Sequence, residues 1–205
     1  LHRLIRRQRQ MCIRDRAAFR TKILFDTNQL LQRAKSEEEI LSQTASQLMK
    51  LLNRSLIVYP EQNGDLGSEQ VFGIDGEVPC NIFSAPEERD AANWTFANKK
   101  RSGAGTDSYP DAKGLYLALR TGGGVFGVIG IDLSEKPLDA FENSVLLSIL
   151  GEGALAIENR RNALEKEQAA LQARNEELRA NLLRTISHDC LLYTSPSPRD
   201  AHESR

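Results

Sequence analysis

Cysteine, histidine and long apolar runs are all scarce in this sequence of 205 residues. The cysteines Cys12, Cys80 and Cys190 stand at unrelated spacings, which match neither a disulfide framework nor a zinc site. No apolar run reaches the roughly 20 residues that a membrane-spanning helix needs, and the basic N-terminus lacks the apolar stretch of a signal peptide. These absences favour a reducing, cytoplasmic setting, with no metal site and no membrane-spanning segment.

The composition is that of a globular protein. Hydrophobic residues make up 40% of the chain and charged residues 27%, so the chain is able to bury a core and is not disordered. The length suits one ordinary domain with additional helical material, and no internal repeat is visible.

Both ends of the chain resemble translated sequencing adapters. The string RRQRQMCIRDR occupies residues 6–16, and CLLYTSPSPRD occupies residues 190–200. We therefore expect residues 1–16 and 190–205 to be foreign to the natural protein. The alternative is an arginine-rich tail followed, at the other end, by a Ser/Pro-rich linker.

These two ends make the net charge of the whole chain, −1, less negative than that of the remainder. Without their eight basic and three acidic residues, residues 17–189 hold 19 basic and 25 acidic side chains, a net charge of −6. A basic N-terminal cluster would favour binding to nucleic acid or to anionic lipid. Because that cluster lies in the adapter-like part, we expect no nucleic-acid partner and no direct membrane contact.

Two helices are predicted ahead of any strand. Apolar residues from Phe19 to Ala34 recur on one broad helical face. Ser36 and Glu39 form the S-x-x-E pattern of a capping box, which starts a second helix. Asn53 is the expected end of that helix.

The pattern then changes to short strands. Ser55 to Tyr59 predicts a buried strand closed by Pro60, and a second short strand is expected near residues 71–74. A helix from Pro86 to about Lys100 follows, and residues 101–113 are predicted to form a polar loop.

A hairpin and a long helix complete the predicted fold. Strands over 115–120 and 125–133 flank Thr121-Gly122-Gly123-Gly124, a turn typical of a β-hairpin. A long helix is expected from Leu138 onward. This order predicts an α+β fold, with an antiparallel sheet framed by helices, and a GAF or PAS domain has this general shape.

The glycines at 122, 123, 124, 127 and 130 allow two interpretations. A phosphate-binding loop needs a helix N-terminus behind it, whereas a strand is predicted to follow these glycines. The hairpin turn is therefore favoured, and the glycines inside the second strand indicate close backbone approach.

The late part of the long helix carries leucines at intervals of seven residues, namely Leu164, Leu171 and Leu178. Leu182 fits the alternate position, which is elsewhere occupied by the polar residues Gln168 and Asn175. Sustained seven-residue spacing predicts a coiled-coil seam. We therefore expect a homodimer through this signalling helix.

Few other residues suggest chemistry. Cys80, Trp94 and Tyr116 could line a ligand pocket, although such side chains are more often core. The isolated acids, which include Asp132 and Glu142, are expected to cap helices or lie on the surface.

His188 ends the predicted dimerising helix, and Asp189 follows it directly. A lone histidine at a helix end is usually a polar surface residue. Neutral imidazole is also a competent nucleophile toward a γ-phosphoryl group near pH 7, and a neighbouring carboxylate can orient the ring. His188 is therefore a candidate phospho-acceptor, with Asp189 as its acidic neighbour.

The string LRANLLRTISHD at 178–189 resembles the start of the H-box of histidine kinases, which continues Leu-Arg-Thr-Pro-Leu. FDTNQLLQRAK (25–35), LYLALRTGGGVFGVIGI (115–131) and FENSVLLSILGEGALAIEN (141–159) are together similar to KdpD-type sensor kinases, which respond to turgor and potassium. The resemblance covers essentially all of residues 17–189 and departs from the family pattern at Cys190.

The resemblance implies a GAF-like sensory domain over 17–160, and over 161–189 a signalling helix with the start of a phospho-acceptor domain. The family's kinases are inner-membrane proteins that autophosphorylate on histidine with ATP and Mg and pass the phosphoryl group to a response regulator. This segment would be a cytoplasmic part of one, without a cofactor of its own, and inactive alone because it lacks the ATP-binding domain. Two alternatives are a GAF-type small-molecule-binding module of another signalling protein and a purely structural dimerisation unit.

Overall fold

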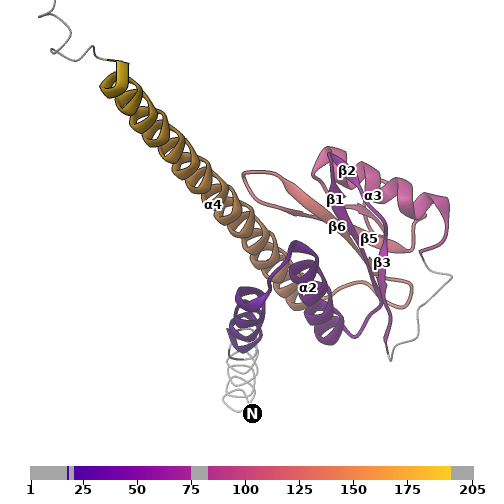
Figure 1. The fold of residues 1–205 in the computed structure, drawn as a ribbon. Helices are drawn as coiled ribbons and strands as arrows, with labels where there is room; N and C mark the ends of the chain where they lie inside the picture. The colour runs from indigo at the N-terminus through magenta and orange to yellow at the C-terminus, as the bar shows by residue number, and fades with distance from the viewer. Residues whose placement is uncertain (1–17, 19–20, 75–82, 195–205) are drawn as a thin grey trace, which may run out of the picture. The chain divides into compact units, whose positions relative to one another are not determined.

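The computed structural model describes residue 18 and residues 21–74 and 83–194, and it describes side chains as far as residue 188 (Figure 1). The adapter-like residues 1–16 lie outside the described part, as do 195–205. The chain divides into two compact units, with the boundary after Arg160. Among the described residues, the strands belong to the first unit, and those of the second unit form the later part of one long helix.

An antiparallel sheet forms the centre of the first unit. Its strands are β1 (Leu56–Gln62), β2 (Asp65–Leu66), β3 (Gln70–Phe72), β4 (Ser102–Gly103), β5 (Gly114–Arg120) and β6 (Val125–Asp132). The order across the sheet is β2-β1-β6-β5-β4, and β3 also pairs with β1. The predicted hairpin is formed by β5 and β6, which lie between β1 and β4 in the sheet.

Alternation along the strands divides the buried side chains between two cores. Leu56 and Val58 of β1 enter the larger core, whereas Ile57 and Tyr59 enter the smaller one. The larger core is covered by the helix over 21–33, by α2 (Glu37–Leu52) and by the beginning of α4 (Ala140–Thr194). The smaller core is covered by α3 (Pro86–Asn98), on the opposite side of the sheet from α2 (Figure 1).

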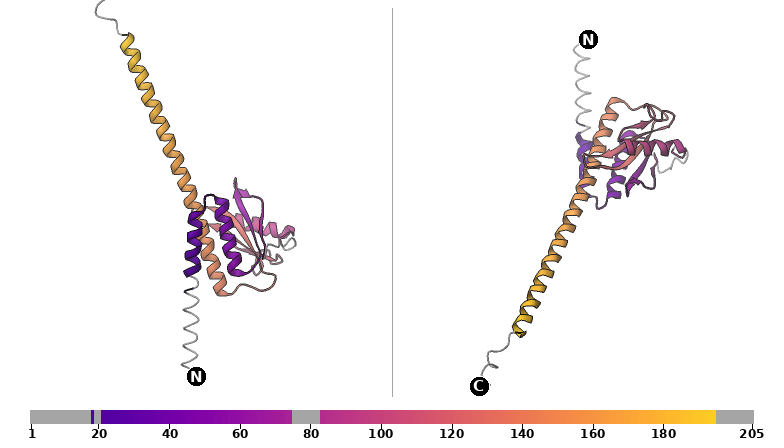
Figure 2. Two further views of the ribbon diagram at one scale, coloured as in Figure 1. Left: turned by 60° about the horizontal axis from the view of Figure 1, so that its bottom comes forward. Right: turned by 90° about the horizontal axis from the view of Figure 1, so that it is seen from above.

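The helix over 21–33 runs beside the first part of α4, as the two views of Figure 2 show. Leu31 belongs to the larger core, and the Asn28 amide donates to the Glu152 carboxylate of α4 at 3.1 Å. This helix therefore adds a further layer to the domain.

The predicted helix ends are confirmed. Ser36 is the N-cap of α2, where its hydroxyl accepts from the Glu39 N–H at 3.1 Å, and the Glu39 carboxylate accepts from the Lys35 N–H. Asn53 ends α2 in the left-handed conformation. Pro86 starts α3 without a side-chain cap, as suits a residue that has no N–H to satisfy.

Two sequence-based predictions about strands are wrong. Pro60 does not close β1, which continues to Gln62 because Pro60 pairs with Gly127 and its carbonyl accepts from the Gly67 N–H at 2.8 Å. Residues 101–113 are not all loop, since Ser102 and Gly103 pair with Tyr116 and Leu115 as β4. Both strands are held by partners distant in sequence, which local propensity does not reveal.

The glycines of β6 are required by close packing. A Cβ on Gly127 would lie 2.6 Å from the carbonyl oxygen of Tyr59, and a Cβ on Gly130 would overlap the Tyr116 ring. At the turn, the Thr121 N–H donates to the Gly124 carbonyl at 3.0 Å. The hairpin interpretation of this glycine-rich stretch is confirmed.

Within the described residues, one helix is long and apolar enough to pass a length-and-composition test for a membrane span, over Ala140–His188. Its side chains Val145, Ile149 and Ile157 are fully buried in the larger core. Packing against the sheet accounts for part of the apolar character of this helix, and core helices of globular domains pass the same test.

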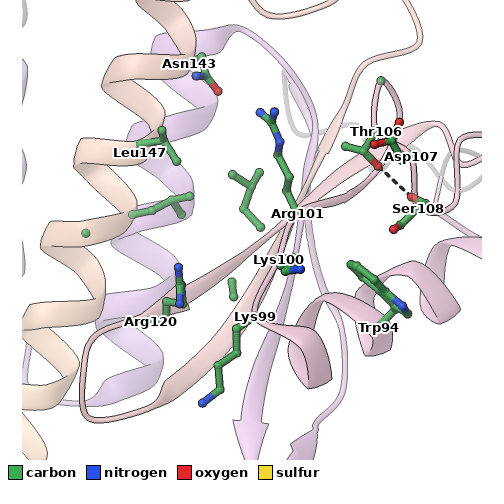
Figure 3. Close-up of a pocket in the computed structure, with 15 residues that line it drawn as sticks. Trp94, Lys99, Lys100, Arg101, Thr106, Asp107, Ser108, Arg120, Asn143 and Leu147 are labelled. Atoms are coloured by element: carbon green, nitrogen blue, oxygen red, sulfur yellow. Dashed lines mark hydrogen bonds between the residues drawn. The ribbon is translucent and has the colours of Figure 1, made fainter.

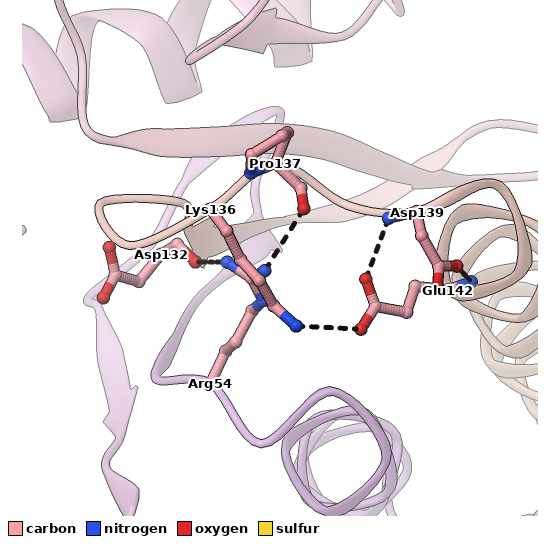
Figure 4. A network of polar contacts seen from close by, with 6 residues as sticks. All are labelled: Arg54, Asp132, Lys136, Pro137, Asp139 and Glu142. Carbon is pink, nitrogen blue, oxygen red and sulfur yellow. Dashed lines mark hydrogen bonds and ion pairs between the residues drawn. The ribbon is translucent and has the colours of Figure 1, made fainter.

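Arg54 joins the end of α2 to the loop between β6 and α4 (Figure 4). Its guanidinium donates to the carbonyls of Asp132 at 3.0 Å and Pro137 at 3.5 Å. Beyond that loop, Asp139 and Glu142 cap α4 reciprocally: the Glu142 N–H donates to the Asp139 carboxylate, and the Asp139 N–H donates to the Glu142 carboxylate. Arg54 thus fixes the loop from which α4 begins.

Arg54→Ala should lower the free energy of unfolding by about 1–3 kcal/mol, because two carbonyls next to α4 lose their donor. The control Lys50→Ala, at an exposed position of α2, should change it by less than about 0.5 kcal/mol. Urea unfolding followed by the fluorescence of Trp94, the single tryptophan, measures both. Equal midpoints for the two variants would contradict a structural role for Arg54.

Candidate functional site

A groove of about 910 Å³ opens in the first unit between three elements. One wall is the outer edge of β5 beyond β4, where Leu117, Ala118 and Arg120 lie. A second wall is the first part of α4, with Asn143, Leu147, Leu150 and Gly151. The segment after α3, together with Trp94 near the end of that helix, forms the third wall (Figure 3).

The polar lining of the groove is predominantly cationic. Lys99, Lys100 and Arg101 are consecutive in sequence, and Arg120 comes from the end of β5. Asp107 is the one carboxylate among the described lining residues. Figure 3 shows the Arg101 side chain extending into the space between Asn143 and the Thr106–Ser108 turn.

The local backbone explains where the three consecutive cations lie. Lys99 ends α3 in the left-handed conformation (φ 58°), with its N–H donating to the Thr95 carbonyl at 2.9 Å. Ser102 is fully buried, and its hydroxyl donates to the Ala91 carbonyl at 2.8 Å and contacts the Thr95 hydroxyl at 2.7 Å. The basic tripeptide is therefore held at both ends by its own helix.

The three candidate pocket residues, Cys80, Trp94 and Tyr116, do not lie together in one pocket of the described structure. Trp94 is half-buried and lines the groove. Tyr116 belongs to the smaller core, as the favoured interpretation of that residue predicted, and Cys80 lies outside the described residues. The four cations of the groove were not identified from the sequence, because Arg120, at the end of β5, is separated from the other three by β4 and the rest of β5.

The buried Glu88 of α3 is a second feature that sequence reasoning missed. Its carboxylate accepts from the Lys113 N–H at 2.6 Å, the Gly114 N–H at 3.1 Å and the Tyr116 hydroxyl at 2.7 Å. Burial, and then the hydrogen bond to Glu88, raises the pKa of Tyr116 well above its ordinary value. Glu88 therefore fixes the start of β5.

The acids expected at caps or on the surface are found there. The Asp132 carboxylate accepts from the Ser134 N–H at 2.9 Å, and Glu142 completes the α4 cap described above. Among the described residues, no group of three or more His, Cys, Asp or Glu side chains is placed to hold a metal ion.

His188 lies in the second unit, on the exposed surface of α4. One turn before it, the Thr185 hydroxyl donates to the Asn181 carbonyl at 3.0 Å. The backbone of Asp189 is helical, and its side chain lies outside the described residues. Leu171, Leu178 and Leu182 on the same helix are between 54% and 63% exposed.

The first unit has the fold of a GAF domain. It superposes on the crystal structure of the GAF domain of the potassium sensor histidine kinase KdpD from Escherichia coli, with a TM-score of 0.52 and 22% identity over 74% of this chain and 99% of that one. The GAF domain of an Acinetobacter phosphoenolpyruvate-protein phosphotransferase gives a TM-score of 0.50 at 11% identity, over 70% of this chain and 95% of that one. The expected α+β class is therefore confirmed.

The sequence is similar to those of KdpD sensor proteins. The chain is 33% identical to sensor protein KdpD of Clostridium acetobutylicum over 171 residues, which is 83% of the chain, and 26% identical to that of Escherichia coli K12 over 174 residues. It is thus a homologue of KdpD sensor proteins in their GAF region. The chain spans about a fifth of the length of these relatives, 19% and 18% respectively. No family model matches the sequence.

Tyr59, in the smaller core, makes the stability of the domain depend on pH in the alkaline range. Burial, followed by the charge of Glu69, raises the pKa of Tyr59 from 10.0 to about 12, although the Arg89 guanidinium 4.8 Å from the ring centre opposes the shift. The unfolded chain therefore loses this proton at a lower pH than the folded chain. The stabilisation is complete below the ordinary pKa and is lost as the pH rises toward about 12.

We expect the free energy of unfolding to fall between about pH 10 and pH 12, and to fall less steeply in Tyr59→Phe, which lacks one of the phenols responsible. Urea midpoints measured across this range test the effect, with Tyr109→Phe, at an exposed tyrosine, as the control. A Tyr59→Phe chain with the same pH slope as the parent would show that Tyr59 does not contribute.

Proposed function

We propose that this chain is the sensory and transmitter segment of a KdpD-like sensor histidine kinase that regulates potassium transport. The observation that carries the proposal is the 33% identity to sensor protein KdpD across 83% of the chain, which extends from the GAF domain into the long helix. In this proposal residues 17–160 sense or relay a stimulus, and residues 161–189 transmit it. Residues 1–16 and 190–205 are taken as foreign sequence.

The surface of α4 in the second unit supports a dimer. Leu164, Leu171 and Leu178 are 38%, 57% and 54% exposed, although a leucine gains free energy when it is buried. They recur every seven residues, so they lie along one stripe of the helix. A second copy of the chain, packed in parallel along that stripe, would cover all three.

Polar residues interrupt the same seam. Gln168 and Asn175 alternate with the leucines, and such positions lower the stability of a coiled coil while restricting its register. A seam of this kind has the small free-energy difference between arrangements that a switch requires. We infer that a stimulus at the GAF domain changes the rotation or register of the seam, and that this change reaches His188.

In the parent protein His188 would accept a phosphoryl group from ATP. An imidazole nitrogen attacks the γ-phosphorus, an N–P bond forms, and the bond from phosphorus to the ADP oxygen breaks. The other ring nitrogen carries a proton, which the neighbouring Asp189 carboxylate can accept in a hydrogen bond. A response regulator would then receive the phosphoryl group.

In the proposed kinase, a separate catalytic domain would bind ATP and its magnesium ion. The 205-residue chain alone should therefore be inactive. The parent is proposed to be an inner-membrane protein, with this segment on the cytoplasmic side. The second candidate function is a small-molecule-binding and dimerisation module of another signalling protein, which the open groove beside Trp94 favours.

Replacing Leu171 and Leu178 with lysine should convert the dimer to a monomer, because two charges per chain would lose water at the seam. Sedimentation equilibrium of the 205-residue chain measures this. Leu183→Lys is the matched control: Leu183 is 65% exposed but lies off the seven-residue stripe, so its dimer should persist. A parent chain that sediments as a monomer, or a double variant that stays dimeric, would exclude this seam.

In an intact kinase rebuilt around residues 17–189, His188→Gln should abolish labelling from γ-labelled ATP. Asp189→Asn should slow labelling by roughly 10²–10⁴-fold, which is the usual contribution of an orienting or general-base group. The product should be acid-labile and base-stable, as expected of an N–P bond. Acid-stable label on Thr185 or Ser187 that survives His188→Gln would contradict the assignment.

A further inference from the structure

We propose that the groove between α4, the free edge of β5 and the segment after α3 binds a small soluble anion that carries two or more phosphate groups. The inference deepens the proposed sensory role, because it names the ligand class of the GAF domain. The observations that support this ligand class are the residues that line the groove, and they are independent of the assignment of His188.

The charge of the groove is opposite to that of the surrounding chain. Four cations face one carboxylate in the groove, whereas residues 17–189 carry a net charge of −6. The ion pairs Arg89–Glu69 and Lys136–Glu142 of the described residues involve no groove cation. Like charges gathered without partners repel each other, and a bound anion would remove that cost.

A solvated basic surface is the simpler explanation, and it accounts for only part of the arrangement. A cation at the end of α3 interacts favourably with the helix dipole, which explains Lys99. Arg120 lies on another element, β5, yet lines the same groove. Arg101 is followed directly by the buried and hydrogen-bonded Ser102, so its backbone is held in place. A preorganised backbone lowers the entropy cost of binding.

The types of cation favour phosphate groups. Arg101 and Arg120 each carry a planar guanidinium that can donate two parallel hydrogen bonds to phosphate oxygens, while Lys99 and Lys100 act as point charges. A net excess of three positive charges matches a ligand with two or three phosphate groups better than a single carboxylate. The Asn143 amide on α4 is a further donor on the opposite wall.

The remaining lining sets the size and the organic part of the ligand. A volume of about 910 Å³ lies within the range of small-molecule sites. Trp94 and the half-exposed Leu147 offer an apolar surface beside the cations, against which a carbon skeleton could pack. Asn143 and Leu147 belong to α4, whose later residues form the seam, so the ligand would touch the transmitting helix itself.

Isothermal titration of the 205-residue chain with inorganic pyrophosphate and tripolyphosphate tests the proposal. We expect saturable binding that weakens as salt is added, because exposed charges are screened. The double variant Arg101→Gln/Arg120→Gln should bind at least about tenfold more weakly, since it loses two charge-assisted contacts. The control Arg33→Gln/Lys50→Gln removes the same charge from exposed positions outside the groove and should bind like the parent.

Absence of saturable binding, or an equal loss in both double variants, would overturn the proposal. Binding to vesicles that contain phosphatidylinositol phosphates, without binding to either soluble probe, would also overturn it in favour of a membrane surface. These titrations use no ATP and no catalytic domain, so their failure leaves the phospho-acceptor proposal intact. Loss of His188 labelling, in turn, would leave the groove unaffected.

Discussion

The packing of α4 against the β-sheet is the interaction on which the other features depend. Val145, Leu146, Ile149 and Ile157 are fully buried between the helix and strands β1, β5 and β6. Each such side chain contributes about 1.5–3 kcal/mol relative to exposure. The same contacts fix the side of α4 that faces the groove, and Arg54 with the Asp139–Glu142 cap fixes the point at which the helix begins. A helix fixed in this way can serve both as a core element and as an output.

The two parts of α4 differ in the spacing and the burial of their apolar residues. Up to Arg160 the apolar residues satisfy a sheet, so they form a broad stripe that is buried within one chain. Beyond that point Leu164, Leu171 and Leu178 recur every seven residues and are exposed. The proposed role of the segment follows from this change, because a helix that is rigid in its own domain and metastable in a dimer can pass on a small displacement. In the proposed kinase, this displacement would reach His188, the candidate phospho-acceptor.

Elements with a strong local signal were predictable from the sequence. The Ser36–Glu39 capping box, the Asn53 stop and the glycine-rich hairpin depend on residues close together in the chain, and all three are confirmed. Features that depend on distant partners were not. Pro60 remains in a strand because Gly127 lies opposite, and Ser102 forms β4 because it pairs with Tyr116 of β5.

The candidate sites divide in the same way. His188 was identified through the resemblance of a contiguous string to a known motif, and its role remains a prediction. The cationic groove was missed, because it is assembled from the end of α3, the end of β5 and the start of α4. Glu88 was missed for a related reason: its backbone and hydroxyl donors are 25 to 28 residues away. A single sequence gives no indication that such residues converge.

The natural sequence that follows Asp189 tests the central claim most directly. Amplifying the locus from the source DNA, with primers placed inside residues 17–189 and read outward, determines it. A KdpD-like transmitter predicts Leu-Arg-Thr-Pro directly after Asp189, as in the phospho-acceptor motif of histidine kinases. Genomic DNA that instead continues with CLLYTSPSPRD would contradict both the kinase assignment and the foreign origin of residues 190–205.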